Sequence, residues 1–336
     1  MHIGKRYSTL EVIIWTRRNI YKLFVVGLIP VLIYQVLGLK WIALPWTVVA
    51  LLGTATAFIV GFRNSQTYNR TWEARQIWGG ILNLSRSWGV MARDFINQPN
   101  TSKTLIFRHL AWLTALRFAM REARGWETMS EAHNVEFQQK MFVVPEKETT
   151  LEKELQTYLA ADELAYILST KNKAAQLLSL QSKNIKQLFD NAQLSDYRFV
   201  EMQRLVKDLY DMQGRSERIK NFPYPRQFAT TNKVLVALFN VLLPFCMLKE
   251  FDKLNESVEG FMKGNMIWLV IPFSLLISWV FTTLDQVGES TENPFEGSSN
   301  DVPISQMSRT IEIDLREMLG ETDLPPALQA KNNIVL

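Results

Sequence analysis

Four uncharged, apolar runs interrupt an otherwise polar chain. Three of them cover residues 23–39, 41–62 and 264–284. A helix needs about 20 apolar residues to cross the hydrocarbon core of a bilayer, so the last two runs predict membrane spans directly. The first run has about 17 residues, which is the short end of the range for a span. Pro30 within it predicts a kink.

The fourth run, residues 234–248, is too short to span a bilayer by itself and also fits a buried core helix. Adding residues 228–232 makes it long enough, with the ammonium of Lys233 reaching the interface or facing protein. Interpreted in this way, the chain has four spans. Only a tight turn around Lys40 separates the first two, which predicts a helical hairpin.

Basic residues set the predicted orientation of the spans. Arg63, Arg70 and Arg75 follow the second run at once, and the residues before the first run carry further arginines and lysines. Because cytoplasmic segments are enriched in such residues, both ends of the hairpin are predicted to lie in the cytoplasm. With four spans, both chain termini are expected to lie there as well.

The polar stretch after the second run predicts helices rather than strands. Residues 105–124, 174–185 and 198–219 each have apolar positions at helical spacing. The predicted fold class is therefore an all-α membrane protein with four transmembrane helices and a cytoplasmic helical region. By residue number, we predict an amphipathic N-terminal arm over 1–19, transmembrane helices 1 and 2 within 20–62, a cytoplasmic helical region over 63–231, transmembrane helices 3 and 4 within 232–286, and a cytoplasmic C-terminal tail over 287–336.

Composition narrows the class of protein. Of the 336 residues, 47% are hydrophobic and 21% are charged, and the mean hydropathy is −0.04. This balance suits a chain that lies partly in a membrane and partly in water. A formal net charge of +4 is too mild to indicate nucleic-acid binding. The single cysteine, Cys246, excludes an internal disulfide and a cysteine metal cluster, and we expect no signal peptide.

The sequence contains few motifs that indicate catalysis. The three histidines are far apart in sequence, and neither H-E-x-x-H nor G-x-S-x-G occurs. His109 lies in an apolar helical pattern, so we interpret it as a core or surface histidine rather than a ligand. We therefore expect no enzymatic activity, no catalytic residue and no metal site.

Two rows of residues recur at every fourth position of the second apolar run. The row of small residues is Gly53, Ala57 and Gly61. The other row is Thr54, Phe58 and Phe62. Small residues at this spacing lie on one helix face and let another backbone come close, which predicts helix packing. Spacing alone leaves the second row open, because its rings could face lipid, pack against protein or line a pore.

Motifs in and around this run resemble the bestrophin family of membrane ion channels. The longest is GFRNSQTYNRTWEAR, residues 61–75. Three more stretches agree in order along the chain: WTRRNIYK at residues 15–22, PYP at residues 223–225, and NPF at residues 293–295 with a polar loop after it. The resemblance therefore covers nearly the whole chain.

The resemblance implies a homopentamer around a central pore, with the second span lining a narrow neck. The neck positions carried over by motif are Thr54, Phe58 and Phe62, and Thr54 departs from the bulkier residue common in the family. A lower cytoplasmic aperture is implied near Tyr197, with a tyrosine at an ordinary helix interface as the alternative.

A calcium site is not expected. In animal bestrophins an acidic loop directly after the Asn-Pro-Phe motif binds calcium. Here the acidic residues of that loop are only Glu296 and Asp301. Calcium takes six to eight oxygen ligands, usually with several carboxylates, so we expect no calcium and no other cofactor.

The resemblance implies a passive ion channel, with anion (chloride) conduction as the family default. Two alternatives stay open: a monovalent-cation channel of the same fold, and a non-conducting membrane scaffold. Expected partners are other copies of the chain, the lipid membrane and permeant inorganic ions, and the expected location is the cell membrane. Arg63, Arg70, Glu73 and Arg75 either shape the field at the mouth of the pore or form ion pairs between helices and contacts to lipid head groups.

Overall fold

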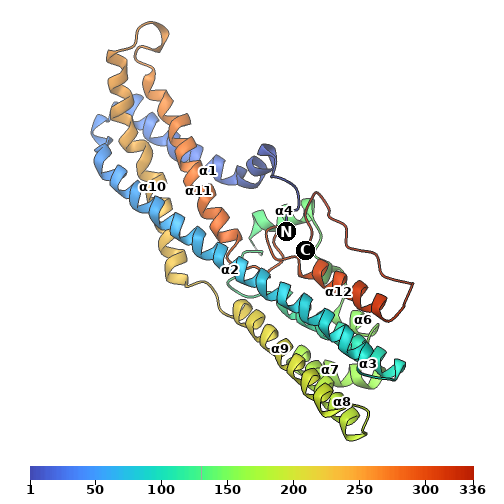
Figure 1. Ribbon diagram of the computed structural model, residues 1–336. Helices are drawn as coiled ribbons and strands as arrows, with labels where there is room; N and C mark the ends of the chain where they lie inside the picture. Colours follow the sequence, from blue (N-terminus) through green and yellow to red (C-terminus); the bar gives the residue numbers. More distant parts are fainter. Residues whose placement is uncertain (130) are drawn as a thin grey trace. The chain divides into compact units, whose positions relative to one another are not determined.

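The computed structural model describes residues 1–129 and 131–336, with the side chains of residues 132 and 133 left aside. This described chain is almost wholly helical, with isolated β-bridges where residues 2 and 331 meet residue 334 (Figure 1). The predicted helical fold class is confirmed to that extent. The chain forms two compact units, each assembled from segments that are far apart in sequence.

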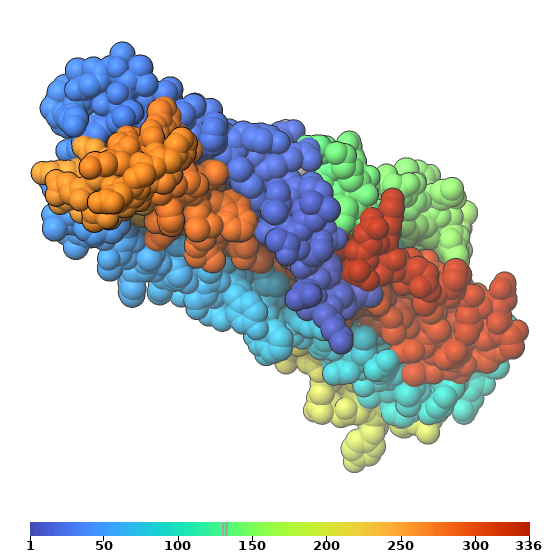
Figure 2. Space-filling model, turned by 90° about the horizontal axis from the view of Figure 1, so that it is seen from above, coloured from blue at the N-terminus to red at the C-terminus, as the bar shows by residue number. Residues whose placement is uncertain are grey.

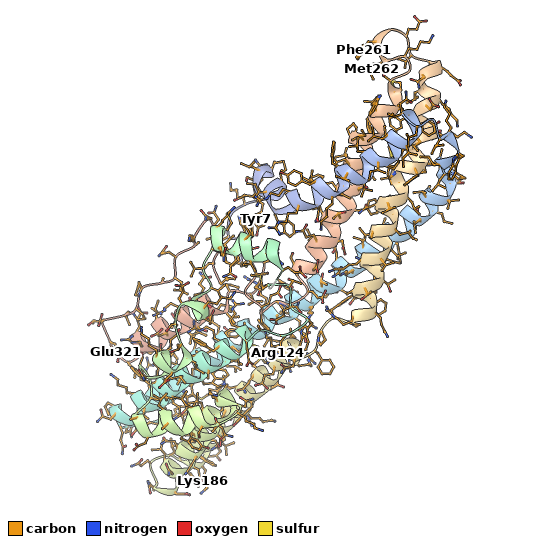
Figure 3. All side chains as sticks on the ribbon, turned by 180° about the vertical axis from the view of Figure 1, so that it is seen from behind. Tyr7, Arg124, Lys186, Phe261, Met262 and Glu321 are labelled. Atoms are coloured by element: carbon orange, nitrogen blue, oxygen red, sulfur yellow. The ribbon has the colours of Figure 1, made fainter. Side chains whose placement is uncertain are left out.

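The apolar unit consists of Lys5–Asn69 and Tyr224–Glu292. Its long helices are α1 (Thr9–Gln35), the first part of α2 (Trp46–Asp94), α10 (Arg226–Lys253) and α11 (Val270–Ser290). Its short 3-10 turns are η1 (Lys40–Ile42), η2 (Leu254–Glu256), η3 (Gly260–Met262) and η4 (Met266–Leu269). α1, α10 and α11 pack against one another, and Figure 2 shows α1 beside α11. Phe261 and Met262 lie at the tip of the connection between α10 and α11 (Figure 3).

α1 begins where the sequence favours a helix start. Ser8 Oγ accepts a hydrogen bond from the N–H of Glu11 at 3.2 Å, and the Glu11 carboxylate accepts one from the N–H of Ser8 at 2.6 Å. This reciprocal capping box satisfies two N–H groups at the helix start. The helix then continues unbroken from the predicted arm into the predicted first span, with Pro30 inside it.

Among the described residues, three helical segments are long and apolar enough to cross a membrane: Lys40–Asp94, Arg226–Glu256 and Met266–Ser290. They indicate an integral membrane protein. α10 joins residues 228–232 to the short fourth run, because a helix that starts at Arg226 includes both. α1 is not among the three segments, so the first span stays a prediction.

The polar unit consists of Met1–Gly4, Arg70–Pro223 and Asn293–Leu336, and it includes the rest of α2. Its other helices are α3 (Pro99–Arg121), α4 (Ala132–Met141), α5 (Pro145–Glu148), α6 (Leu151–Leu155), α7 (Ala161–Ser169), α8 (Lys173–Asp190), α9 (Asp196–Asn221) and α12 (Ile304–Met318). The three predicted middle helices correspond to α3, α8 and α9. α3 starts earlier than predicted, because a proline suits the first turn of a helix.

α3 lies at the centre of the polar unit and packs against α6, α8, α9 and α12. Trp112 Nε1 donates a hydrogen bond to Gln213 Oε1 of α9 at 2.9 Å. His109 lies fully buried beside the rings of Trp88 and Trp112, with its Nε2 2.9 Å from Ser85 Oγ. Burial lowers the pKa of His109 to about 3, so this residue is a neutral core histidine.

Candidate functional site

The row Thr54, Phe58 and Phe62 lies on one exposed face of α2. The Phe58 side chain is 76% exposed and that of Phe62 is 52% exposed in the single chain. Thr54 Oγ1 donates a hydrogen bond to the carbonyl of Ala50 at 3.0 Å, so its hydroxyl is satisfied within the helix. Val48 and Leu51 extend the exposed apolar surface toward the start of the helix. The single chain thus leaves two aromatic rings and a wide apolar strip uncovered.

The other side of α2 carries a buried stripe. Its members are Val49, Gly53, Thr56, Val60, Arg63 and Thr67. Their spacing alternates between three and four residues, which keeps a stripe on one side of a helix. This regular burial fixes which side of α2 faces its neighbours.

The row of small residues divides between the two sides. A Cβ added at Gly53 would lie 2.7 Å from the ring of Phe239 in α10, so only glycine allows this close approach. A Cβ at Gly61 would meet nothing within 4 Å, and Ala57 is exposed. Within the described single chain, close packing occurs at Gly53. Ala57 and Gly61 are on the exposed surface of α2.

Arg63 of the buried stripe forms two ion pairs. Its Nη1 lies 2.5 Å from Asp285 Oδ1 and its Nη2 lies 3.0 Å from Glu292 Oε2. Asn232 of α10 donates a further hydrogen bond to Asp285, and Arg226 pairs with Glu292. The charges of the two arginines and two carboxylates balance, and the group links α2, α10 and the end of α11. Arg63 therefore forms inter-helix ion pairs, one of the two interpretations made from the sequence.

The other charged residues after the second run also have partners. Arg70 donates hydrogen bonds to the carbonyls of Ile219 and Phe222, at the end of α9. Glu73 pairs with Arg218, also on α9. Arg75 Nη1 lies 3.1 Å from the sulfur of Met1. In the polar unit, Arg70 and Glu73 thus attach this part of α2 to α9.

Tyr197, predicted at a lower aperture, is the second residue of α9. Its side chain is 88% exposed in the single chain. An exposed aromatic ring at a helix start leaves both interpretations of this residue possible, and the aperture stays a prediction.

Glu296 and Asp301, predicted to be too few for a calcium site, are both buried in the polar unit. Glu296 accepts hydrogen bonds from the N–H and the hydroxyl of Thr128, both at 2.8 Å. Asp301 accepts from the N–H of Gly297 at 2.6 Å and pairs with Arg121 at 3.1 Å. Burial and the neighbouring Asp301 raise the pKa of Glu296 to about 8. Across the described residues, no group of three or more His, Cys, Asp and Glu side chains is placed to hold a metal ion.

Sequence reasoning did not identify the partners of Arg63. Asp285 directly follows the last apolar run, and Glu292 directly precedes the NPF motif. A lone carboxylate at the end of an uncharged run is costly unless it is paired. That cost was the available signal, but it does not say which arginine is the partner.

Known proteins are similar to this chain along most of its length. A model of one protein family, described as "Bacterial/Fungal Bestrophin protein", matches residues 10–317. The voltage-dependent anion channel-forming protein YneE of Escherichia coli K12 is 27% identical over 294 residues, 87% of this chain and 82% of that protein. A protein of the same description from Ralstonia nicotianae is 25% identical, over 82% of this chain and 78% of its own length. The crystal structure of a bacterial bestrophin homologue from Klebsiella pneumoniae has a fold similar to this one, with a TM-score of 0.75, 24% identity, and coverage of 92% of this chain and 99% of that one.

Proposed function

Because this chain belongs to the bacterial and fungal bestrophin family, we propose that it forms a passive ion channel whose pore is lined by the exposed face of α2. In this proposal five copies surround a central axis in the cell membrane, with both termini in the cytoplasm. The neck consists of three stacked rings, one each from Thr54, Phe58 and Phe62.

The observation that carries the proposal is the pair of opposed faces on α2. The buried stripe already occupies the side toward α10 and α11, so the side that bears Phe58 and Phe62 is left for other molecules. Around a symmetry axis, that side meets its own copies. A narrow ring of apolar side chains excludes water and forms a barrier to ions, so the neck can act as a gate.

The proposed permeant ion is an anion, with chloride as the first candidate. The relatives in Escherichia coli and Ralstonia nicotianae are named voltage-dependent anion channel-forming proteins. The edge of a phenyl ring is weakly positive, so ring edges turned to the axis favour an anion. This preference is weak, and a monovalent-cation channel of the same fold is the alternative. In either case Tyr197 is proposed at the lower aperture, and no resident metal or cofactor takes part.

A reversal potential tests the proposed ion selectivity. The purified chain is placed in a planar bilayer with a sodium chloride gradient across it. A reversal near the chloride equilibrium potential supports the anion channel, and a reversal near the sodium potential supports the cation channel. No current from a stable oligomer, also in the Phe58→Ala variant, would favour a non-conducting scaffold.

The Phe58→Ala variant tests the neck. Removing the ring widens the proposed constriction, so single-channel conductance is expected to rise. Phe24→Ala is the matched control, because Phe24 is also an exposed ring of the apolar unit but lies on α1. Unchanged current in Phe58→Ala, or an equal rise in both variants, would contradict the neck.

Crosslinking tests whether copies meet at the axis. Phe58→Cys is made in a Cys246→Ala background, because Cys246 is the one native cysteine. Disulfide-linked subunits are expected on mild oxidation. Their absence from an intact oligomer would place Phe58 away from the axis.

A further inference from the structure

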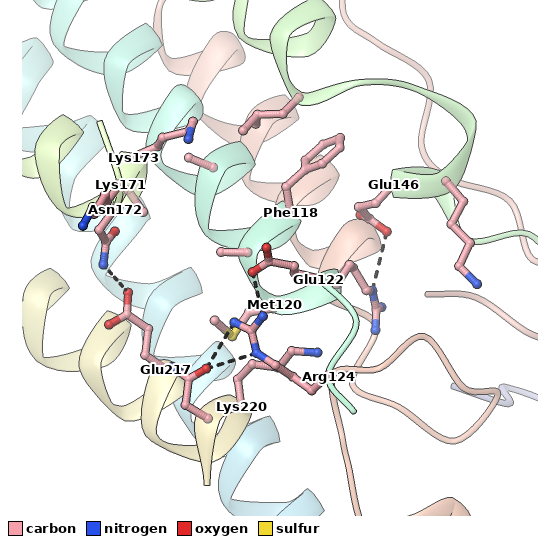
Figure 4. A pocket seen from close by; sticks show the side chains of 17 residues that line it. Phe118, Met120, Glu122, Arg124, Glu146, Lys171, Asn172, Lys173, Glu217 and Lys220 are labelled. Carbon is pink, nitrogen blue, oxygen red and sulfur yellow. Dashed lines mark hydrogen bonds and ion pairs between the residues drawn. The ribbon is translucent and has the colours of Figure 1, made fainter. Parts of the chain in front are cut away.

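The polar unit contains a cavity of about 530 Å³ that the channel proposal does not use. The cavity is open on one side and lined by the last turns of α3 and α9, the start of α8, and residues of α5 and α6. Figure 4 shows Lys171, Asn172 and Lys173 on one side and Glu146 on the other, with Phe118 between them. This volume is within the range of about 300–1,000 Å³ that small-molecule sites occupy.

Positive charge predominates in the lining. The basic residues are Arg121, Arg124, Lys147, Lys171, Lys173 and Lys220. The acidic residues are Glu122, Glu146 and Glu217. The excess of cations makes the cavity attractive to an anion.

The carboxylates of the lining are already engaged. Glu146 pairs with Arg117 at 2.8 Å and with Arg121 of the lining at 3.5 Å. Glu122 pairs with Arg124 at 2.8 Å. Glu217 accepts hydrogen bonds from the side-chain amides of Asn172 and Gln213 at 2.9 and 2.8 Å. These partners leave the acids little capacity to neutralise the lysines.

Three of the six cations pair with carboxylates: Arg121 with Asp301, Arg124 with Glu122, and Lys220 with Glu127. The three lysines Lys147, Lys171 and Lys173 have no carboxylate partner among the described residues. Lys173 Nζ donates to the carbonyl of Thr170 at 3.1 Å. Lys147 Nζ donates to an amide oxygen at 2.8 Å. The charge of Arg121 is already paired, with Asp301 at 3.1 Å, but its buried Nη2 has no hydrogen-bond acceptor among the described residues. A buried donor without an acceptor is costly, and an anion in the cavity would supply one.

The start of α8 adds to this potential. α8 has 18 residues, and Asn172 caps it by accepting a hydrogen bond from the N–H of Ala175 at 2.9 Å. The N–H groups of Lys173 and Ala174, in the first turn, have no acceptor within the helix. The helix start carries a partial positive charge and N–H groups that suit an anionic group.

We propose that this cavity binds a small organic anion with two or more phosphate or carboxylate groups. One anionic group is held by Lys171, Lys173 and the start of α8, and a second by Arg121 and Lys147 on the opposite wall. Phe118 and Leu151 provide apolar surface for the body of the ligand. A chloride ion is too small to reach both walls, so this site is separate from permeation.

Isothermal titration calorimetry on the full chain in detergent micelles tests the site. The probes are inorganic pyrophosphate and citrate, at constant chloride concentration. Saturable binding with a Kd below about 1 mM is expected for at least one of them. No saturable heat from either probe would overturn the proposal. Because this measurement does not depend on conduction, it tests the anion site independently of the proposed channel function.

Charge-reversal variants locate the binding. Lys171→Glu combined with Lys173→Glu is expected to weaken binding at least about tenfold, because two attractive charges become repulsive. Glutamate in the first turn also favours the helix, so the variant is expected to fold. Lys183→Glu is the control, since Lys183 is exposed on the same helix but outside the cavity. An equal loss in the control, or no loss in the double variant, would refute the site.

Discussion

Replacing Arg63 with alanine tests how firmly α2 is held in the apolar unit. The Arg63 side chain is 3% exposed and that of Glu292 is 2% exposed, so water cannot replace the lost partner. Removing one member of a buried ion pair costs roughly 3–5 kcal/mol, because the other charge is left buried and unpaired. Here Arg226 still pairs with Glu292 and Asn232 still donates to Asp285. We therefore expect Arg63→Ala to lose about 3 kcal/mol, the low end of that range.

The assay is the free energy of unfolding in detergent micelles, followed by tryptophan fluorescence during denaturant titration. A cycle of Arg63→Ala, Asp285→Asn and the double variant isolates the pair. Because Asp285→Asn removes the carboxylate that Arg63→Ala leaves unpaired, the double variant should lose less than the sum of the single losses, by roughly 0.5–3 kcal/mol. Arg93→Ala is the control, since Arg93 pairs with Asp94 on an exposed surface.

Two results would refute this reasoning. The first is a loss for Arg63→Ala no larger than that of the Arg93→Ala control. The second is strict additivity in the cycle, which would mean that Arg63 and Asp285 do not interact in the folded chain. Either result would mean that the ion pairs of Arg63 do not fix which side of α2 faces α10 and α11.

Two further predictions concern packing and pH. Gly53→Val should destabilise the chain by about 1–3 kcal/mol more than Gly61→Val, because the added side chain meets Phe239 only at position 53; equal losses in denaturant titration would contradict the contact. Burial and Asp301 raise the pKa of Glu296 from 4.5 to about 8, so the folded chain keeps this proton at pH values where the unfolded chain has lost it. Stability should therefore fall as pH rises from about 4.5 to 8, and Glu296→Gln should flatten that slope in thermal unfolding; an unchanged slope would show that another group is responsible.

The sequence predicts the helices of the apolar unit well, because a long uncharged run has few alternatives to a membrane helix. Residues 41–62 lie in α2, apart from the turn that precedes it, and residues 264–284 lie in η4 and α11, apart from their first residues. The short fourth run shows the limit of this reasoning. Hydropathy alone could not choose between a core helix and a span, whereas the start of α10 at Arg226 makes the helix long enough to cross.

Contacts between distant segments could not be predicted in the same way. Arg63 and its partners Asp285 and Glu292 are more than 200 positions apart, and nothing in the local pattern joins them. The same holds for the N–H of Ile3, which donates to the carbonyl of Asn333 at 2.8 Å. The basic cavity is a further example, since its lysines and arginines come from segments of the polar unit that are far apart in sequence. Periodicity shows which face of a helix is buried, but it does not name the partner.

The two faces of α2 are linked by the geometry of one helix. Successive residues of an α-helix are rotated by about 100°, so a residue held in place fixes the direction of its neighbours. Arg63 is held by Asp285 and Glu292, and Phe62 directly precedes it. The rings of Phe58 and Phe62 are therefore turned away from α10 and α11 by the same ion pairs that hold Arg63. If the exposed face lines a pore, the buried charges behind it decide which side chains reach the axis, and loss of Arg63 should disturb conduction as well as stability.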